Sequence, residues 1–256
     1  MTIKLIVLFL APLLAGFLIY LVPKGRNANY KLLLVFAGSY LFAITVSHIL
    51  PELYREHEEV RFTGIFVLVG FFLQQVLEYF TSGVEHGHLH GHADHHHHHD
   101  HPHHSHGVSA FFLLVALCVH AFLEGAMLAQ PSAGNEVYNV NAVLLGIVLH
   151  RAPAAFALMT VLTFQLGSSR KALPFLLAFS LAAPLGLLLS SHLSATQILT
   201  RNGLIYLYAL VCGNFLQIST TIVFESSPEH RFNPLKLLVG GAGAVAAVGL
   251  EIIMSE

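Results

Sequence analysis

Two histidines stand near the middle of apolar stretches that are long enough to cross a bilayer. His120 occurs in HAFLEGAMLA and His150 in HRAPAAFAL. Ionisable side chains in hydrocarbon are costly, so they usually face the interior of a helix bundle and mark a site or a pathway. His120 and Glu124 are four residues apart, which places both on one face of a helix, where they can hold one cation together. An imidazole and a carboxylate suit a borderline divalent metal such as zinc or iron.

Arg151 follows His150 directly and supports a competing interpretation. An arginine at the membrane midplane costs at least ~2.5 kcal/mol on insertion scales, so it needs a partner, and Glu124 is the obvious candidate. In this interpretation an ion pair locks two helices, and the histidines make interhelical hydrogen bonds. A nearby guanidinium also repels a dication. Pro153 is expected to kink its helix and to free a carbonyl near the site.

The segment EHGHLHGHADHHHHHDHPHHSHG is crowded with histidine and has low complexity. Neutral imidazole is the commonest protein ligand for transition metals, so this loop predicts metal binding at many adaptable sites. An expression tag and a solvated linker without a metal role are the alternatives. The run is internal and interrupted, which argues against a tag. The loop histidines are His86, His88, His90, His92, His95, His96, His97, His98, His99, His101, His103, His104 and His106.

The composition indicates a polytopic membrane protein. Of the 256 residues 55% are apolar and only 10% are charged, and the mean hydropathy is +0.69. A soluble domain usually carries about 25% charged residues. The net charge of −2 provides no basic surface, so no nucleic-acid partner is predicted. Cys118 and Cys212 both fall inside apolar spans, so no disulfide framework is predicted.

Eight segments are predicted to cross the bilayer as helices, since a crossing needs about 20 residues and irregular backbone cannot face lipid. The predicted fold is therefore all-α. One membrane domain consists of residues 1–83 with three helices, a histidine-rich cytoplasmic loop at 84–107, and residues 108–256 with five helices. The first apolar stretch lacks a basic n-region and is predicted to be retained. The spans are roughly 4–22, 31–51, 62–82, 108–130, 139–166, 172–193, 202–224 and 235–253.

The distribution of lysine and arginine predicts that both termini lie outside and that the histidine loop is cytoplasmic. Cytoplasmic loops carry an excess of basic residues, and one side has more of them than the other. The richer side holds Lys24, Arg26, Lys31, Arg170, Lys171, Arg231 and Lys236, and the poorer side holds Lys4, Arg55, Arg61 and Arg201. The expected location is a bacterial inner (plasma) membrane.

This orientation can be tested by cysteine labelling. In a Cys118→Ala, Cys212→Ala background, a cysteine replacing Ser132 should react with an impermeant reagent from outside. A cysteine replacing Ser168 should react only after permeabilisation, because it follows the fifth span on the basic side. The reverse pattern would invert the topology.

Charged residues at the ends of two spans are candidates for the mouths of an ion path. His48 and Glu52, in HILPE, lie at the predicted outer end of the second span. Glu225 and Glu229, in ESSPE, lie at the predicted inner end of the seventh span. Charged span ends are usually only interfacial, but an ion path needs a mouth on each side. We therefore predict His48 and Glu52 at the entrance, and Glu225 and Glu229 at the exit.

Taken in order, these motifs resemble those of the ZIP (Zrt/Irt-like) family of divalent metal transporters, over nearly the whole chain. HILPE at 48–52 resembles H-x-L-P-E, and HAFLEG at 120–125 resembles H-N-x-P-E-G. HRAPAA at 150–155 is similar to H-E-x-P-H-E or Q-N-x-P-E-G. APLG at 183–186 resembles E-P-L-G, and ESSPE at 225–229 resembles E-x-x-P-E. The resemblance implies eight spans, outer termini and a transport site on spans four to six.

The chain departs from the family pattern at the transport site, which in the family often holds two metals. His120, Glu124 and His150 match family ligands and are predicted to hold one metal. Arg151 replaces an acidic or amide ligand, and we hypothesise that it stands in for the charge of the second metal. The other departures are Ala121, Leu123, Ala154 and Ala183.

The sequence therefore predicts a carrier that moves a divalent metal, zinc first among the candidates, into the cytoplasm, with no organic cofactor and no enzymatic activity. Metal ions and the lipid bilayer are the expected partners, and a homodimer is left open. One alternative is a non-transporting metal sensor or buffer that acts through the loop. Another is an intramembrane zinc hydrolase with His120, His150 and His192 as ligands and Glu124 as base. His192 lies at the end of its span, and no H-E-x-x-H occurs.

Overall fold

The computed structural model describes residues 1–20, 28–56, 59–81, 110–131, 137–225 and 233–255, and these ranges are helical without any strand. The predicted all-α class is confirmed. The helices are α1 (Thr2–Phe17), followed by the 3-10 turn η1 (Leu18–Tyr20); α2 (Ala28–Ile44), the π-helical turn η2 (Thr45–Ile49) and α3 (Leu50–Glu56); then α4 (Val60–Thr81), α5 (Ala110–Met127), α6 (Val140–Leu166), α7 (Ser169–Ala195), α8 (Arg201–Glu225) and α9 (Pro234–Ser255).

Within these ranges seven helical stretches are long and apolar enough to cross a membrane, and the eighth predicted span is the shorter helix α5. It ends at Met127 rather than near residue 130. Pro131 disfavours helix for the residue before it and has no N–H to donate. The carbonyls freed at this end have partners, since Tyr138 donates to the carbonyl of Met127 and Tyr208 to that of Ala129. Irregular backbone is tolerated at membrane depth because it is enclosed by protein.

The second span is longer than predicted. It runs from Leu32 to Glu56 through α2, η2 and α3, instead of ending near residue 51. Pro51 lacks the N–H that would bond to the carbonyl of Ser47. The π-helical turn lies just before this proline, with the N–H of Leu50 bonded to the carbonyl of Thr45. A π turn widens the helix by one residue, so the chain passes the proline without ending the helix.

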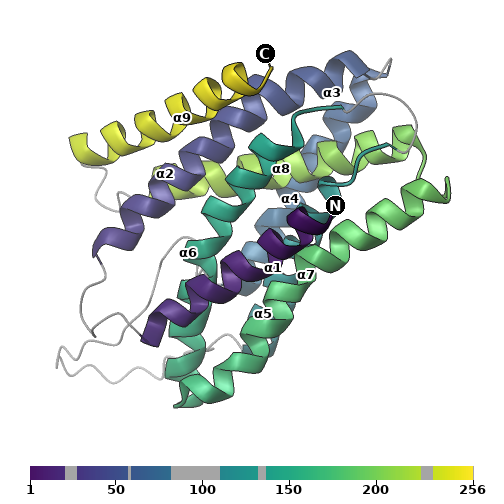
Figure 1. Ribbon diagram of the computed structural model, residues 1–256. Helices are drawn as coiled ribbons and strands as arrows, with labels where there is room; N and C mark the ends of the chain where they lie inside the picture. The colour runs from purple at the N-terminus through teal and green to yellow at the C-terminus, as the bar shows by residue number, and fades with distance from the viewer. Residues whose placement is uncertain (21–27, 57–58, 82–109, 132–136, 226–232, 256) are drawn as a thin grey trace, which may run out of the picture.

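The helices pack in two groups (Figure 1). Helices α1, α5, α6 and α7 pack mainly on one another and are called the site bundle here; α2, α4, α8 and α9 form the second bundle. The two bundles meet mainly where α2 contacts α6 and α4 contacts α5. Helix α1 begins and α9 ends at the same end of the molecule, as an even number of crossings requires. Large apolar side chains such as Phe72 and Val245, 60% and 72% exposed, mark the surface that faces lipid.

Helices α5 and α7 approach each other through two glycines. A Cβ added to Gly125 would lie 1.9 Å from the carbonyl oxygen of Ala183, and one added to Gly186 would lie 2.0 Å from the carbonyl oxygen of Phe122. Small residues let the backbones of membrane helices come this close. The crossing fixes α5, which carries the HAFLEG motif, against α7.

Replacing Gly186 by alanine should destabilise the protein by about 1–3 kcal/mol, because the added methyl meets a backbone oxygen that cannot rotate away. Gly249→Ala is the matched control, since a Cβ at Gly249 meets nothing within 4 Å. Thermal unfolding of the purified proteins should show a lower Tm for Gly186→Ala and little change for Gly249→Ala. Equal Tm values would contradict the close crossing.

Candidate metal-binding site

Helix α5 carries the first two predicted ligands on one face. The Nε2 atom of His120 lies 3.2 Å from Oε1 of Glu124. Both side chains are buried, with 3% and 0% of their surface exposed. The i, i+4 spacing seen in the sequence therefore brings the imidazole and the carboxylate together inside the bundle.

Helix α6 brings His150 to the same place. The side chain is 1% exposed, and its ring centroid lies 5.9 Å from that of His120, with the ring planes at 89°. One ligand atom each from His120, Glu124 and His150 can be chosen so that all three lie within 4.8 Å of one another. Zinc holds nitrogen and oxygen ligands at about 2.0–2.2 Å, so closing on an ion needs only a small inward shift of these side chains.

Helix α6, which carries His150, is well defined at both ends. Asn139 caps the helix, and its Oδ1 accepts hydrogen bonds from the backbone N–H groups of Asn141 and Ala142. At the other end Gly167 has a φ of 65°, the left-handed conformation that commonly terminates a helix. Pro153 lies inside the helix and is buried. The helix runs through this proline without interruption, and the expected kink there stays a prediction.

Arg151 lies beside this group. Its Nε atom is 3.8 Å from Oε2 of Glu124, too long for a hydrogen bond but within ion-pair distance. Its Nη2 donates to the carbonyl of Phe179 on α7, 3.0 Å away, and its Cζ lies 4.7 Å from the centroid of the Phe179 ring. Glu124 therefore directs one oxygen toward His120 and the other toward Arg151. The metal-ligand arrangement and the ion pair proposed as its alternative are both present.

The remaining positions of the family pattern offer no further ligand side chain. Ala154 is 4% exposed and Ala183 is 0% exposed, and neither methyl group can bind a cation. Ala183 lies at the crossing with Gly125, one residue from Glu124. Among the residues that the structure describes, the one group of three ligand side chains is that of His120, Glu124 and His150. That these side chains hold a metal stays a prediction.

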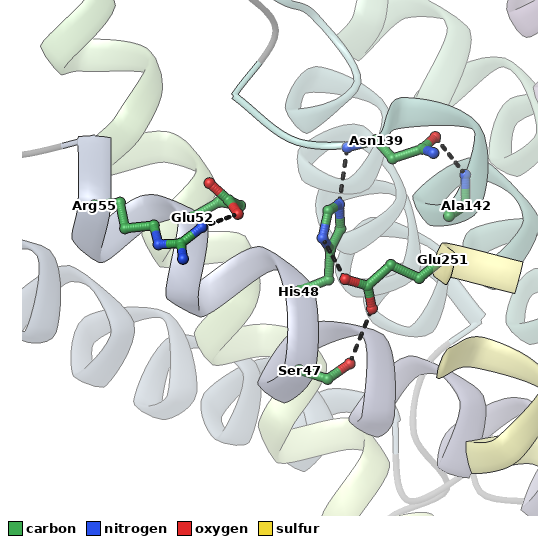
Figure 2. Close-up of polar contacts among 7 residues, drawn as sticks. All are labelled: Ser47, His48, Glu52, Arg55, Asn139, Ala142 and Glu251. Carbon is green, nitrogen blue, oxygen red and sulfur yellow. Dashed lines mark hydrogen bonds and ion pairs between the residues drawn. The ribbon is translucent and has the colours of Figure 1, made fainter. Parts of the chain in front are cut away.

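The two residues predicted at the entrance do not point toward each other (Figure 2). His48 is bonded to Glu251 of α9 and to the backbone of Asn139, whereas Glu52 pairs with Arg55 at 3.0 Å. Sequence reasoning missed Glu251, although an acidic residue within the apolar run VGLEII was a signal for it. It also missed Phe179, whose role is played by a carbonyl and a ring that no polar motif marks.

Several predicted residues cannot be placed. The side chain of Glu225 lies outside the described residues, and so do Glu229 and the thirteen loop histidines. His192, which the hydrolase hypothesis needs as a ligand, is exposed near the end of α7 and is not part of the ligand group.

An all-α bundle with membrane-spanning helices and a buried His-Glu-His set defines a polytopic membrane protein with a candidate metal site. Comparison with known proteins supports this class. Residues 81–249, well over half of the chain, match the model of the ZIP zinc transporter family, and the chain belongs to that family. It is therefore a member of a transporter family and not an enzyme.

The chain is also similar to the zinc transporter ZIP9 of Macaca fascicularis. The two are 32% identical over 116 residues, which cover 43% of this chain and 48% of the relative. The chain thus matches about half the length of this curated relative.

The geometry predicts that Arg151 weakens metal binding, because Glu124 faces both the metal position and the guanidinium. In a protein lacking residues 86–106, Arg151→Ala should bind zinc at least about tenfold more tightly. The guanidinium lies beside the carboxylate that would hold the zinc, and removing a like charge a few ångströms from a cation is worth several kcal/mol. His120→Ala should abolish binding at this site. Arg170→Ala is the control, because Arg170 is exposed at the start of α7.

Isothermal titration calorimetry with zinc would measure these differences. Unchanged affinity in Arg151→Ala would show that the guanidinium does not compete with the metal for Glu124.

Proposed function

We propose that this chain carries a divalent transition metal, zinc first among the candidates, across the membrane into the cytoplasm through one site formed by His120, Glu124 and His150. The observation that carries this proposal is the convergence of the three ligand atoms within 4.8 Å, all buried. Family membership supports a metal as the cargo. The ligands come from α5 and α6, so the site travels with one bundle if the two bundles move against each other.

The charges of the site support a carrier that returns empty. Glu124 and Arg151 are 0% and 1% exposed, and their charges cancel. A lone buried carboxylate would oppose any movement of the empty site through a low-dielectric environment, whereas a neutral pair opposes it less. A bound dication leaves a net positive charge beside Arg151. Zinc is then held loosely enough to be released on the other side.

The entry of metal requires a local rearrangement. The carboxylate must turn from Arg151 toward the ion while Arg151 keeps its hydrogen bond to the carbonyl of Phe179, which holds the guanidinium in place. Two imidazoles and one carboxylate supply three ligands, and the fourth position of a tetrahedral zinc stays open for water. An open position allows ligands to exchange, as a transport site needs.

The second candidate function is a sensor or buffer that binds metal through the histidine loop and does not transport. The contact between Arg151 and Glu124 is the observation that favours it, because a fixed ion pair leaves no ligand for a metal. In this case the loop would carry the activity, and the buried histidines would only hold helices together.

Uptake into proteoliposomes separates the two functions. The protein lacking residues 86–106 should stay folded and take up zinc, because that segment has few apolar residues to pack. It should bind fewer metal ions in total. His120→Ala should lose uptake. Comparing zinc, iron, manganese and cadmium would define the cargo.

An intact protein that shows no uptake, or uptake unchanged in His120→Ala, would favour the sensor or buffer. Loss of folding after removal of the loop would show that the loop is structural.

A further inference from the structure

His48 ties three parts of the molecule together. It lies in the π-helical turn η2 and is mostly buried. Its Nδ1 atom is 2.9 Å from Oε1 of Glu251 on α9, and its Nε2 accepts a hydrogen bond of 2.9 Å from the backbone N–H of Asn139 (Figure 2). Ser47, the preceding residue, donates to the other oxygen of Glu251 at 3.4 Å. These contacts use both ring nitrogens of His48.

The two bonds require one tautomer of the ring. A backbone N–H can only donate, so Nε2 must present its lone pair to Asn139. The carboxylate of Glu251 is an acceptor, so Nδ1 must carry the proton and donate it. Neutral imidazole with its proton on Nδ1 satisfies both partners, and no other form of the ring does.

The bond to Asn139 crosses between the two bundles. His48 and Glu251 belong to the stretch α2–η2–α3 and to α9, whereas Asn139 is the cap of α6 in the site bundle. Another hydrogen bond between the bundles joins the same helix, because the hydroxyl of Tyr40 donates to the carbonyl of Ala142 at 3.1 Å. The first turn of α6 is therefore held to the second bundle at its cap and at Ala142, three residues further on.

The hydrogen bond between His48 and Asn139 is connected to the candidate metal site through α6. His150 follows Asn139 by eleven residues on the same helix, a distance of about 16 Å at the rise of an α-helix. A helix transmits a shift of its first turn to its middle. Releasing the cap would thus free the end of the helix that carries one of the candidate ligands.

We propose that His48 is a positioning residue, a latch that holds the first turn of α6 against the second bundle and opens when a divalent cation takes the place of the Nδ1 proton. The second part rests on the proposed function, which supplies such a cation. A cation on Nδ1 occupies that lone pair, so the proton of a neutral ring moves to Nε2. Nε2–H then faces the N–H of Asn139, two donors meet, and the hydrogen bond is lost.

Glu251 places a carboxylate oxygen where a cation on Nδ1 would need a second ligand. The carboxylate lies at hydrogen-bond distance from Nδ1 already, and the Ser47 hydroxyl contacts its second oxygen. Glu52, the acidic residue four positions after His48, instead pairs with Arg55. The arrival of cargo at this end would therefore be coupled to the freedom of α6.

Hydrogen exchange measured by mass spectrometry on the full chain in lipid nanodiscs tests the latch. Without metal, His48→Ala should speed exchange of the amides at 139–146 by about tenfold, as expected for the loss of hydrogen bonds of ordinary strength. His48→Gln is the matched variant, because its amide can donate to Glu251 and accept from Asn139. It should exchange as slowly as the parent protein.

Zinc tests the release. Adding zinc should speed exchange at 139–146 in the parent protein and leave it unchanged in His48→Gln, whose amide has no tautomer to shift. Glu251→Ala provides a second variant if His48→Ala does not fold. Without metal it should speed exchange in the same segment, because Nδ1 loses its acceptor and the tautomer is no longer fixed.

Two results would overturn the proposal: equal exchange in the parent protein, His48→Ala and Glu251→Ala, or zinc acting equally on the parent protein and His48→Gln. Failure of the proposed function is distinguishable. It would appear as absent zinc uptake, while the contrast between His48→Ala and His48→Gln without metal would remain.

Discussion

A buried carboxylate and a buried guanidinium that neutralise each other constrain how the helices around them can pack. Glu124 and Arg151 have almost no exposed surface, and neither charge is tolerable alone in that environment. Helices α5, α6 and α7 are packed so that the guanidinium of Arg151 contacts both the carboxylate of Glu124 and the carbonyl of Phe179. Any metal bound by His120, Glu124 and His150 must draw the carboxylate away from this pair, which sets how tightly it can be held.

The placement of these helices depends on features without charge. The crossing of α5 and α7 works because Gly125 and Gly186 leave room for the facing carbonyls. The early end of α5 is tolerated because tyrosine hydroxyls bond to the carbonyls of Met127 and Ala129. Burying apolar surface contributes little to helix association in a membrane, because lipid is apolar as well. Close packing and satisfied backbone groups therefore hold the ligand-bearing helices in position.

The division into two bundles relates the site to the rest of the chain. The candidate ligands belong to one bundle, whereas His48 and Tyr40 belong to the other and bond to the first turn of α6. The hydrogen bonds at the N–H of Asn139 and at the carbonyl of Ala142 join the first turn of α6 to the second bundle. A transporter that alternates its access needs contacts of that kind, since each must break and re-form during a cycle.

The all-α class, most of the span positions and the proximity of His120 to Glu124 were predictable from the residues, because helix periodicity and the cost of polar groups in hydrocarbon act locally. The sequence also pointed to His150 and Arg151 as their neighbours. The packing of the helices was needed to show that a carbonyl of α7 holds Arg151, and that His48 pairs with Glu251 while Glu52 pairs with Arg55. These partners of Arg151 and His48 are distant along the chain, and one is a backbone group, so no spacing of side chains could reveal them.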